Sequence, residues 1–273
     1  MAINWVDRVP TKPGRIKITP EDGSSAWYGV MERADEPSVV GTPVNAANLN
    51  SMQKNAGLDA NITVYVAVSG SDRTGNGSST SPYQTITKAI STIPKNLNGY
   101  SAYVSVSGGT YNDDVQINGF TGGIIGLIGT AGETVTINSL VIFNSALVVI
   151  RNFDLIVSNN SGSHAIQVYA SNFSCTSKIT CSGSLSRGLY AVTFSRVFIS
   201  NLIVTSASES AVRSEYSVVS IGNVSGNVVG IGFRAYGGSN ITFSSNTLTA
   251  TTMYLTGDGS RIYSGSQTSI PNY

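Results

Sequence analysis

Charged side chains are scarce in this chain. Asp, Glu, Lys and Arg make up 11% of its 273 residues, against about 25% in an ordinary soluble domain. The net charge is +1, so no basic excess favours nucleic acid or an anionic membrane as a partner. This composition is not that of a disordered chain, because 41% of the residues are hydrophobic. Such a composition, with Gly, Ser, Thr and Asn in the polar positions, is typical of stacked β-structure.

Histidine and cysteine are nearly absent. His164 is the single histidine. It has no partner at a ligand spacing, so we expect no metal site and no cofactor. It is also the one histidine base that a Ser or Cys nucleophile would have, and no nucleophile elbow motif is present. Cys175 and Cys181 lie in one extended run that holds their Cα atoms too far apart for a disulfide. We expect two free, buried cysteines.

Long apolar runs are missing as well. No segment approaches the roughly 20 residues of a membrane-spanning helix. The stretch from Met1 to Arg8 lacks the basic region and the apolar core of a secretion signal. The sequence therefore predicts no membrane insertion and assembly in a cytosol.

The chain does contain a loose repeat of about 22 to 26 residues. Four short β-type runs each end in Asn plus one residue: Leu147–Phe153, Val197–Leu202, Val218–Val224 and Ile241–Thr247. A fifth copy, Phe173–Ile179, has Lys178 in the Asn position. Units of this length are too short for paired helices, so the period predicts a mainly β fold, a parallel β-helix of roughly seven coils. Second-strand candidates recur at Ala165–Val168, Leu189–Val192, Ala211–Arg213 and Gly232–Arg234.

The repeated asparagines predict a structural column. Asn tolerates left-handed backbone and stacked Asn side chains bond to each other along a solenoid axis. Its members are Asn152, Asn201, Asn223 and Asn246.

Four segments follow from these patterns. Residues 1–57 lack the repeat and form a small module with a helix over Gly41–Gly57. Residues 58–115 hold an opening strand and a helix that caps the solenoid. Ser81 and Pro82 start this helix through a capping box, and the apolar set Ile86, Ala89, Ile90 and Ile93 continues it to Pro94. Residues 116–262 form the β-helix, and residues 263–273 form a polar tail.

Two stretches resemble known families. Pro10-Thr-Lys-Pro-Gly-Arg-Ile-Lys-Ile-Thr-Pro20, Met31-Glu-Arg-Ala-Asp-Glu-Pro37 and Gly41-Thr-Pro-Val-Asn-Ala-Ala-Asn-Leu-Asn50 resemble the N-terminal attachment segment of tail and tail-fibre proteins from phages and prophages of Gram-positive bacteria. The resemblance covers residues 1–53 and implies a virion component whose N-terminus binds tail or baseplate proteins. The implied attachment residues are Trp5, Trp27, Met31, Arg33, Pro43 and Leu49.

The second resemblance concerns the fold. Tyr65-Val-Ala-Val-Ser-Gly-Ser-Asp72 and Ser81-Pro-Tyr-Gln-Thr-Ile-Thr-Lys-Ala-Ile90 resemble the opening segment of pectate-lyase-like right-handed parallel β-helices. That segment occurs in secreted carbohydrate-active proteins and in phage appendages, so it indicates fold better than activity. Together the resemblances imply a tail fibre or tailspike, usually a homotrimer, that contacts the host surface or spaces another module from the tail. A bacterial adhesin is disfavoured by the missing secretion signal.

A glycan of the host surface is the expected ligand. Tyrosines recur near the second-strand positions, beside two arginines one repeat apart, and aromatic faces next to guanidinium groups hold sugars. Packing of these tyrosines at coil edges or between subunits is the structural alternative. The candidates are Tyr169, Tyr190, Tyr216, Tyr236, Arg213 and Arg234, and Tyr254 also lies near a second-strand position.

A small polysaccharide depolymerase is the rival function. Glycoside hydrolysis needs two carboxylates on one face, and Glu209 and Glu215 flank Arg213, with Arg234 one repeat further on. A solvated Glu/Arg pair is the simpler interpretation, and a lyase is disfavoured because no cluster of three acids accompanies the arginines. Calcium ligands, or turn residues, are the two interpretations of Asp72 and of Asn112, Asp113 and Asp114.

Overall fold

The structure is a computed structural model that describes residues 57–159, 161 and 163–265, with the backbone of three short strands at 15–18, 27–30 and 268–269. The chain divides into two units, Met1–Ala56 and Gly57–Tyr273. In the first unit, β1 (Arg15–Ile18) and β2 (Trp27–Val30) pair antiparallel. Trp27 begins β2. The other expected attachment residues, Trp5, Met31, Arg33, Pro43 and Leu49, and the helix expected before Gly57, lie outside the described residues.

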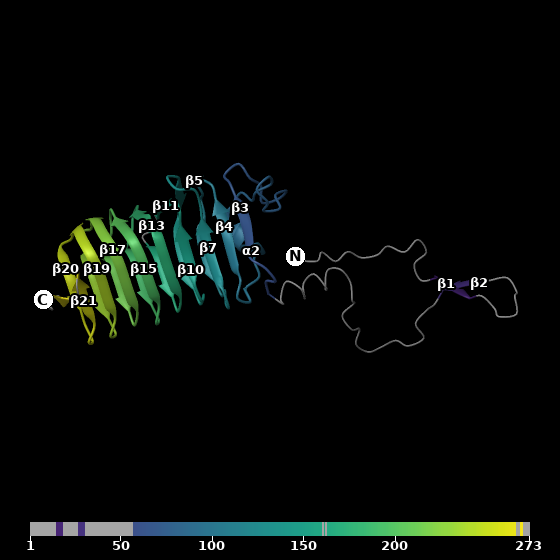
Figure 1. Ribbon diagram of the computed structural model, residues 1–273. Helices are drawn as coiled ribbons and strands as arrows, with labels where there is room; N and C mark the ends of the chain where they lie inside the picture. Colours follow the sequence, from purple (N-terminus) through teal and green to yellow (C-terminus); the bar gives the residue numbers. More distant parts are fainter. Residues whose placement is uncertain are drawn as a thin grey trace. The chain divides into compact units, whose positions relative to one another are not determined.

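The second unit is a parallel β-helix of about seven turns, as the repeat predicted (Figure 1). Each coil runs through three faces in chain order. The first face holds β3 (Ile62–Val66), β4 (Ser101–Val106), β7 (Ile124–Ile128), β10 (Val148–Arg151), β21 (Arg261–Ser264) and the first halves of β13 (Asn172–Ser182), β15 (Arg196–Val204), β17 (Val218–Asn227) and β19 (Asn240–Thr249). The second face holds β5 (Gly109–Thr110), β8 (Thr134–Ile137), β11 (Asp154–Ser158) and the second halves of those four long strands.

The third face carries the candidate site. Its strands, in stacking order, are β6 (Asp114–Asn118), β9 (Ser139–Phe143), β12 (His164–Tyr169), β14 (Arg187–Val192), β16 (Ser210–Glu215), β18 (Ile231–Tyr236) and β20 (Thr252–Thr256). All neighbouring pairs on this face are parallel. The four second-strand candidates of the sequence therefore occupy this face. No helix among the described residues is long and apolar enough to span a membrane.

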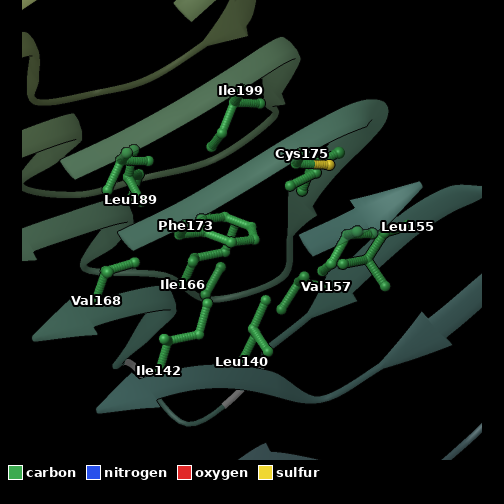
Figure 2. Close-up of a cluster of buried hydrophobic side chains, with 14 of the residues drawn as sticks. Leu140, Ile142, Leu155, Val157, Ile166, Val168, Phe173, Cys175, Leu189 and Ile199 are labelled. Atoms are coloured by element: carbon green, nitrogen blue, oxygen red, sulfur yellow. The ribbon is translucent and has the colours of Figure 1, made fainter. Parts of the chain in front are cut away.

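The core follows from the alternation of side chains along each strand. In β12 and β14, Ile166 and Val168 stack under Leu189 and Ala191, and all four are fully buried. Figure 2 shows side chains from the three faces converging on the same interior. Cys175 points into this cluster, and it and Cys181 are free and buried as expected. Burial raises the pKa of each cysteine thiol to about 12, so both remain protonated.

The capping helix is α2 (Ile86–Thr92), which packs against the opening strands β3, β4 and β6. Its apolar face, Ile86, Ala89 and Ile90, is buried as the spacing predicted. The expected start at Ser81 is wrong. Thr85 is the N-cap, and its hydroxyl accepts from the backbone N–H of Lys88 at 3.1 Å. The helix is shorter than its apolar pattern because Ile93, before Pro94, is already extended.

The asparagine column is half right. Asn201 and Asn223 face each other on neighbouring coils, and the side-chain amide of Asn223 donates to Oδ1 of Asn201 at 2.7 Å. Ser245, not Asn246, continues this register. Asn152 lies apart from it, at a corner with φ of 68°. Asn therefore has two separate roles here, in the ladder and at the left-handed corner. The prediction from sequence wrongly assigned both roles to one column.

A ladder of buried serines joins the coils at the corner between the third and first faces. The backbone N–H of each serine except the last, Ser260, donates to the hydroxyl of the serine one coil further on, over 2.9 to 3.4 Å. Each serine directly follows a residue with positive φ. The buried backbone of a sharp corner thus gains a partner on every coil. The members are Ser145, Ser171, Ser195, Ser217, Ser239 and Ser260.

Replacing Ser217 by alanine is expected to destabilise the β-helix by about 1–3 kcal/mol. The Ser217 hydroxyl accepts from the Ser195 N–H at 3.1 Å and donates to the Glu215 carbonyl at 2.9 Å. Its loss leaves a buried N–H without an acceptor. Urea unfolding measures the change. Ser220→Ala, on the outer side of β17, is the control, and an equal loss in both variants would contradict the role of the ladder.

The last residues depart slightly from the expected tail. β21 runs through Tyr263 to Ser264, and β22 (Thr268–Ser269) pairs with it antiparallel. Part of the segment 263–273 therefore continues the first face.

Candidate functional site

The outer side of the third face carries a cluster of tyrosines, arginines and glutamates, which we call the Tyr/Arg ridge. Strand alternation places Tyr190, Arg213, Glu215, Arg234 and Tyr236 outward, because the strand residues next to them are buried. Parallel registry then stacks Gln167, Tyr190, Arg213 and Arg234 in one column. The ridge comprises Tyr169, Arg187, Tyr190, Glu209, Arg213, Glu215, Arg234 and Tyr236, from β12, β14, β16, β18 and the residue before β16.

Glu209 lies at the centre of the charged part of the ridge. Its carboxylate pairs with Arg187 from the preceding coil, with Arg213 from its own coil and with Arg234 from the next coil. The Arg234 Nη1 lies 2.8 Å from Glu209 Oε1. One carboxylate thus joins three coils. Among the ridge side chains these four are between 15% and 30% exposed, so the network is partly shielded from water.

Arg213 joins Glu209 to the second carboxylate. Its Nε donates to Glu215 at 2.5 Å, its Nη2 pairs with the same oxygen and its Nη1 pairs with Glu209. The Tyr190 hydroxyl donates to the other Glu215 oxygen at 3.0 Å. Burial opposes the charge of Arg213, but the bonds and charges of Glu215 and Glu209 outweigh it and raise the pKa of Arg213. Arg213 is consequently always charged, and all three of its side-chain nitrogens are paired with carboxylates.

Aromatic rings alternate with the guanidinium groups. Tyr169 and Tyr190 meet edge to face with centroids 6.1 Å apart. Arg187 lies 4.8 Å from the Tyr190 centroid, and Arg234 lies 5.5 Å from the Tyr236 centroid. Arg213 stands between the two, 5.7 Å from each ring. These cation–π contacts hold the rings in place at a partly exposed surface. The sequence analysis expected tyrosines beside Arg213 and Arg234, and Tyr190 and Tyr236 lie there.

His164 borders the ridge, although the sequence analysis did not predict it as part of the site. Its Nε2 lies 2.9 Å from Arg187 Nη1, and its Nδ1 lies 2.9 Å from the Ser186 hydroxyl. Arginine has no acceptor, so Nε2 accepts and the imidazole is neutral with its proton on Nδ1. Burial and the charge of Arg187 lower the pKa of His164, while Glu209 partly opposes them. The sequence did hold a signal for its place in the ridge, because His164 and Arg187 are one repeat apart and so lie in register on neighbouring coils.

Two of the expected sugar-binding tyrosines lie elsewhere. Tyr216 has φ of 52° at the serine corner and is 57% exposed beside Phe194, with ring centroids 6.4 Å apart. The left-handed corner turns it away from the third-face strands. Tyr254 falls in an inward register position, where it stacks with Phe233 at 5.8 Å and with Phe243 at 6.2 Å.

The catalytic candidates Glu209, Glu215, Arg213 and Arg234 do converge on one surface. A glycosidase needs one carboxyl that stays protonated as the acid, which requires a raised pKa. Burial raises the pKa of Glu209, but the bonds and charges of Arg187 and Arg213 outweigh it and leave the pKa of Glu209 below its ordinary value. The arrangement favours an ionised Glu209 carboxylate that holds the arginines in place, which does not fit the protonated acid of a glycosidase.

The calcium candidates have structural partners. Asp72 accepts from the backbone N–H of Gln84 at 2.8 Å and of Thr85 at 3.0 Å. Asp113 is buried and accepts from the N–H of Ile86 at 2.7 Å, at the first turn of α2. These aspartates serve the start of the capping helix, where backbone N–H groups lack partners within the helix. Asp114 accepts from the Ser139 hydroxyl at 2.6 Å. Among the described residues no group of three or more His, Cys, Asp or Glu side chains has a metal-binding arrangement.

A hollow on the surface of the β-helix lies away from the ridge. It is shallow and open, has a volume of about 460 Å³ and lies on the first face. Its lining is largely apolar, with Asn172, Arg196 and Ser220 as its polar members, so it offers few groups to orient a polar ligand. The lining residues are Leu147, Asn172, Phe173, Arg196, Val197, Phe198, Val218 and Ser220.

Residues 68–120 match one protein family, described as a protein of unknown function, DUF1565. The matched segment runs from the loop after β3 through α2 and β6 to Phe120, which is the opening of the β-helix. It agrees with the parallel β-helix but assigns no activity. The searches of curated proteins and of solved structures returned no match for this chain.

Lowering the pH from 7.5 to 5 is expected to destabilise the β-helix through His164. Its pKa in the folded chain lies below the ordinary 6.5, so below pH 6.5 the unfolded chain binds a proton that the folded chain resists. This contribution to stability is complete above pH 6.5 and is lost as the pH falls toward the lowered value. Urea unfolding midpoints across this range measure it. A midpoint that falls equally in His164→Gln would assign the effect to other groups.

Proposed function

We propose that this protein is a structural phage tail appendage, a fibre or spike component that attaches through residues 1–57 and binds a host-surface glycan on the third face of its β-helix. The observation that carries the proposal is the Tyr/Arg ridge. It presents the partly exposed rings of Tyr169 in β12, Tyr190 in β14 and Tyr236 in β18. Tyr169 and Tyr190 contact each other, and the Arg213 guanidinium stands between Tyr190 and Tyr236. Sugar rings stack on such aromatic faces and bond to the neighbouring charged groups.

The ridge extends over several coils, which suits a polymer better than a small molecule. Neighbouring parallel strands are about 4.8 Å apart, so tyrosines spaced over four coils from β12 to β18 extend over roughly 14 Å. An extended oligosaccharide of a few sugar units has this length. The rigid stack of strands also leaves little of the ridge to be ordered on binding, so little conformational entropy is lost.

Glycan binding is tested with polysaccharides purified from the surfaces of a panel of Gram-positive hosts. We expect the full chain to co-elute in size-exclusion chromatography with intact polysaccharide from at least one host. Tyr236→Leu should weaken this binding at least tenfold. The control is Tyr103→Leu, which removes a tyrosine that also stacks with an arginine, Arg151, but on the first face. Shortened polysaccharide would instead favour the rival depolymerase, and equal binding by both variants would argue against the ridge.

The attachment function rests on the resemblance of residues 1–53 and on the separation of the chain at Ala56. Deleting residues 1–57 should abolish incorporation into tail particles while the β-helix keeps its glycan binding. Normal incorporation of the shortened chain would contradict the attachment role. Sedimentation of the full chain tests the homotrimer that the resemblance implies.

A further inference from the structure

We infer that the Tyr/Arg ridge selects an acidic glycan, one that carries a carboxylate or a phosphodiester, and that Arg234 is the residue that reads the acid group. The inference rests on the proposed glycan binding and adds the chemical class of the ligand and the residue that sets it. It starts from the balance of charge within the ridge. Three guanidinium groups face two carboxylates, because Arg187, Arg213 and Arg234 share Glu209 and Glu215.

The hydrogen bonds of the ridge are incomplete as well. Three buried side-chain polar atoms lack a partner within the described part of the chain: Arg187 Nε, Ser210 Oγ and Arg234 Nε. All three belong to the surroundings of Glu209, since Ser210 follows it and both arginines pair with it. Buried polar atoms without a partner are uncommon in folded proteins, and each calls for an explanation such as an ordered water or a bound ion. Two of the three are guanidinium N–H donors, so the ridge has more hydrogen-bond donors than acceptors around Glu209 within the described part of the chain.

Arg234 is the arginine that can turn toward a ligand. Arg213 has all three of its nitrogens occupied, and Arg187 is held by both His164 and Glu209. Arg234 is held by Glu209 through Nη1. On its far side the register partner is Leu255 in β20, a strand without a charged residue. A carboxylate or phosphate arriving from that side meets no negative charge of β20.

The neighbouring ring fits the same ligand. Tyr236 lies 5.5 Å from the Arg234 guanidinium and is partly exposed. A sugar stacked on this ring brings an acidic substituent to the outer nitrogens of Arg234, where a guanidinium forms paired bonds with two oxygens. Since the buried Nε has no acceptor, rotation of the side chain toward the ligand breaks one bond to Glu209 and leaves that carboxylate paired with Arg187 and Arg213.

Titration calorimetry with the full chain and three matched probes tests the inference. The probes are a galacturonic acid tetramer, the same tetramer with its carboxyl groups methyl-esterified, and a glycerol phosphate tetramer. We expect one acidic probe to bind at least tenfold more tightly than the neutral ester, with an affinity that falls as salt rises. Which acidic probe binds distinguishes a uronic acid from a phosphodiester as the source of the charge.

Variants locate the effect. Arg234→Gln should bring the acidic probe down to the affinity of the ester, and Arg234→Lys, which keeps the charge without the paired donors, should lie between. Arg261→Gln, on β21 of the first face, should leave every affinity unchanged. Thermal melts verify that each variant folds, and the lysine variant serves if the glutamine variant does not.

The outcomes separate the inference from the proposed function. Equal affinities for acid and ester, with binding still lost in Tyr236→Leu, would overturn the acidic ligand and leave glycan binding standing. Acid selectivity that persists in Arg234→Gln would overturn the role of Arg234. If none of the three probes binds while a neutral host polysaccharide does, the acidic class is wrong. If the panel polysaccharides fail as well, glycan binding itself falls.

Discussion

Replacing Gly226 by alanine is expected to destabilise the β-helix by more than about 4 kcal/mol, a loss that single substitutions rarely reach. Gly226 has φ of 124°, a conformation that side-chain-bearing residues rarely adopt. A Cβ there would lie 2.7 Å from the carbonyl carbon of Val204 and closer still to its oxygen. These are backbone atoms of the paired strand β15, so no side chain can yield.

The strand cannot move away either, because Gly226 pairs with Val204 on one side and with Leu248 on the other. In a solenoid each coil contacts its neighbours alone, so the damage should spread from β17 toward the last coils. Urea unfolding gives the free energy, and hydrogen exchange should show lost protection from β17 to β21 with the opening coils unchanged.

Gly238→Ala is the control for the positive φ alone. Gly238 has φ of 73° and open space around an added Cβ, so this variant should lose about 1–2 kcal/mol. Equal losses at the two positions would mean that the backbone at Gly226 relaxes and that the close approach to Val204 is not decisive.

The fold was predictable because its signal is repeated. Coil after coil places a buried residue one repeat beyond the last, as from Phe173 to Val197, Val219 and Ile241. One such run is weak, but several in series identify a solenoid. The capping helix was predicted for the same reason, by its apolar spacing, while its start was misplaced. Thr85 and Ser81 both satisfy a local N-cap rule, and the contacts of Asp72 and Asp113 with this turn depend on the folded coils.

The serine ladder was missed although its period was in the sequence. Ser195, Ser217 and Ser239 are spaced by 22 residues, which matches the strand repeat, but serine is so common in turns that this spacing alone does not indicate a buried ladder. The alignment of Asn246 failed by one residue for a related reason. A period alone does not give the register, and one residue of slip moves a side chain to another position of the coil.

The candidate site was predictable in its members more than in its arrangement. Alternation and period bring Tyr190, Arg213 and Arg234 into one column, as observed. The corner at Tyr216 escaped prediction because its left-handed backbone belongs to no glycine or asparagine. The central place of Glu209 also escaped, since one carboxylate that pairs with three arginines depends on side-chain directions that no periodicity encodes.

Replacing Arg213 by methionine is expected to cost about 1–3 kcal/mol of stability, between the values typical of exposed and buried ion pairs, and to weaken glycan binding more than tenfold. Among the described residues, Arg213 is the one guanidinium that contacts both Glu209 and Glu215, and it stands 5.7 Å from both Tyr190 and Tyr236. Without it Glu215 keeps the Tyr190 hydroxyl as a partner but loses its counter-charge. Urea unfolding and calorimetry with the host polysaccharide measure the two losses.

The matched control is Arg151→Met, which removes an arginine stacked on Tyr103 at 5.0 Å on the first face. The double variant Arg213→Met with Glu215→Gln then separates the two roles of Arg213. If the stability loss comes from the stranded Glu215 carboxylate, the second change restores much of it. Binding should stay weak, because the cation between the two rings is still missing. Recovery of both properties together would mean that Arg213 acts on the glycan solely by neutralising Glu215, and the ridge would then bind through its rings without this guanidinium.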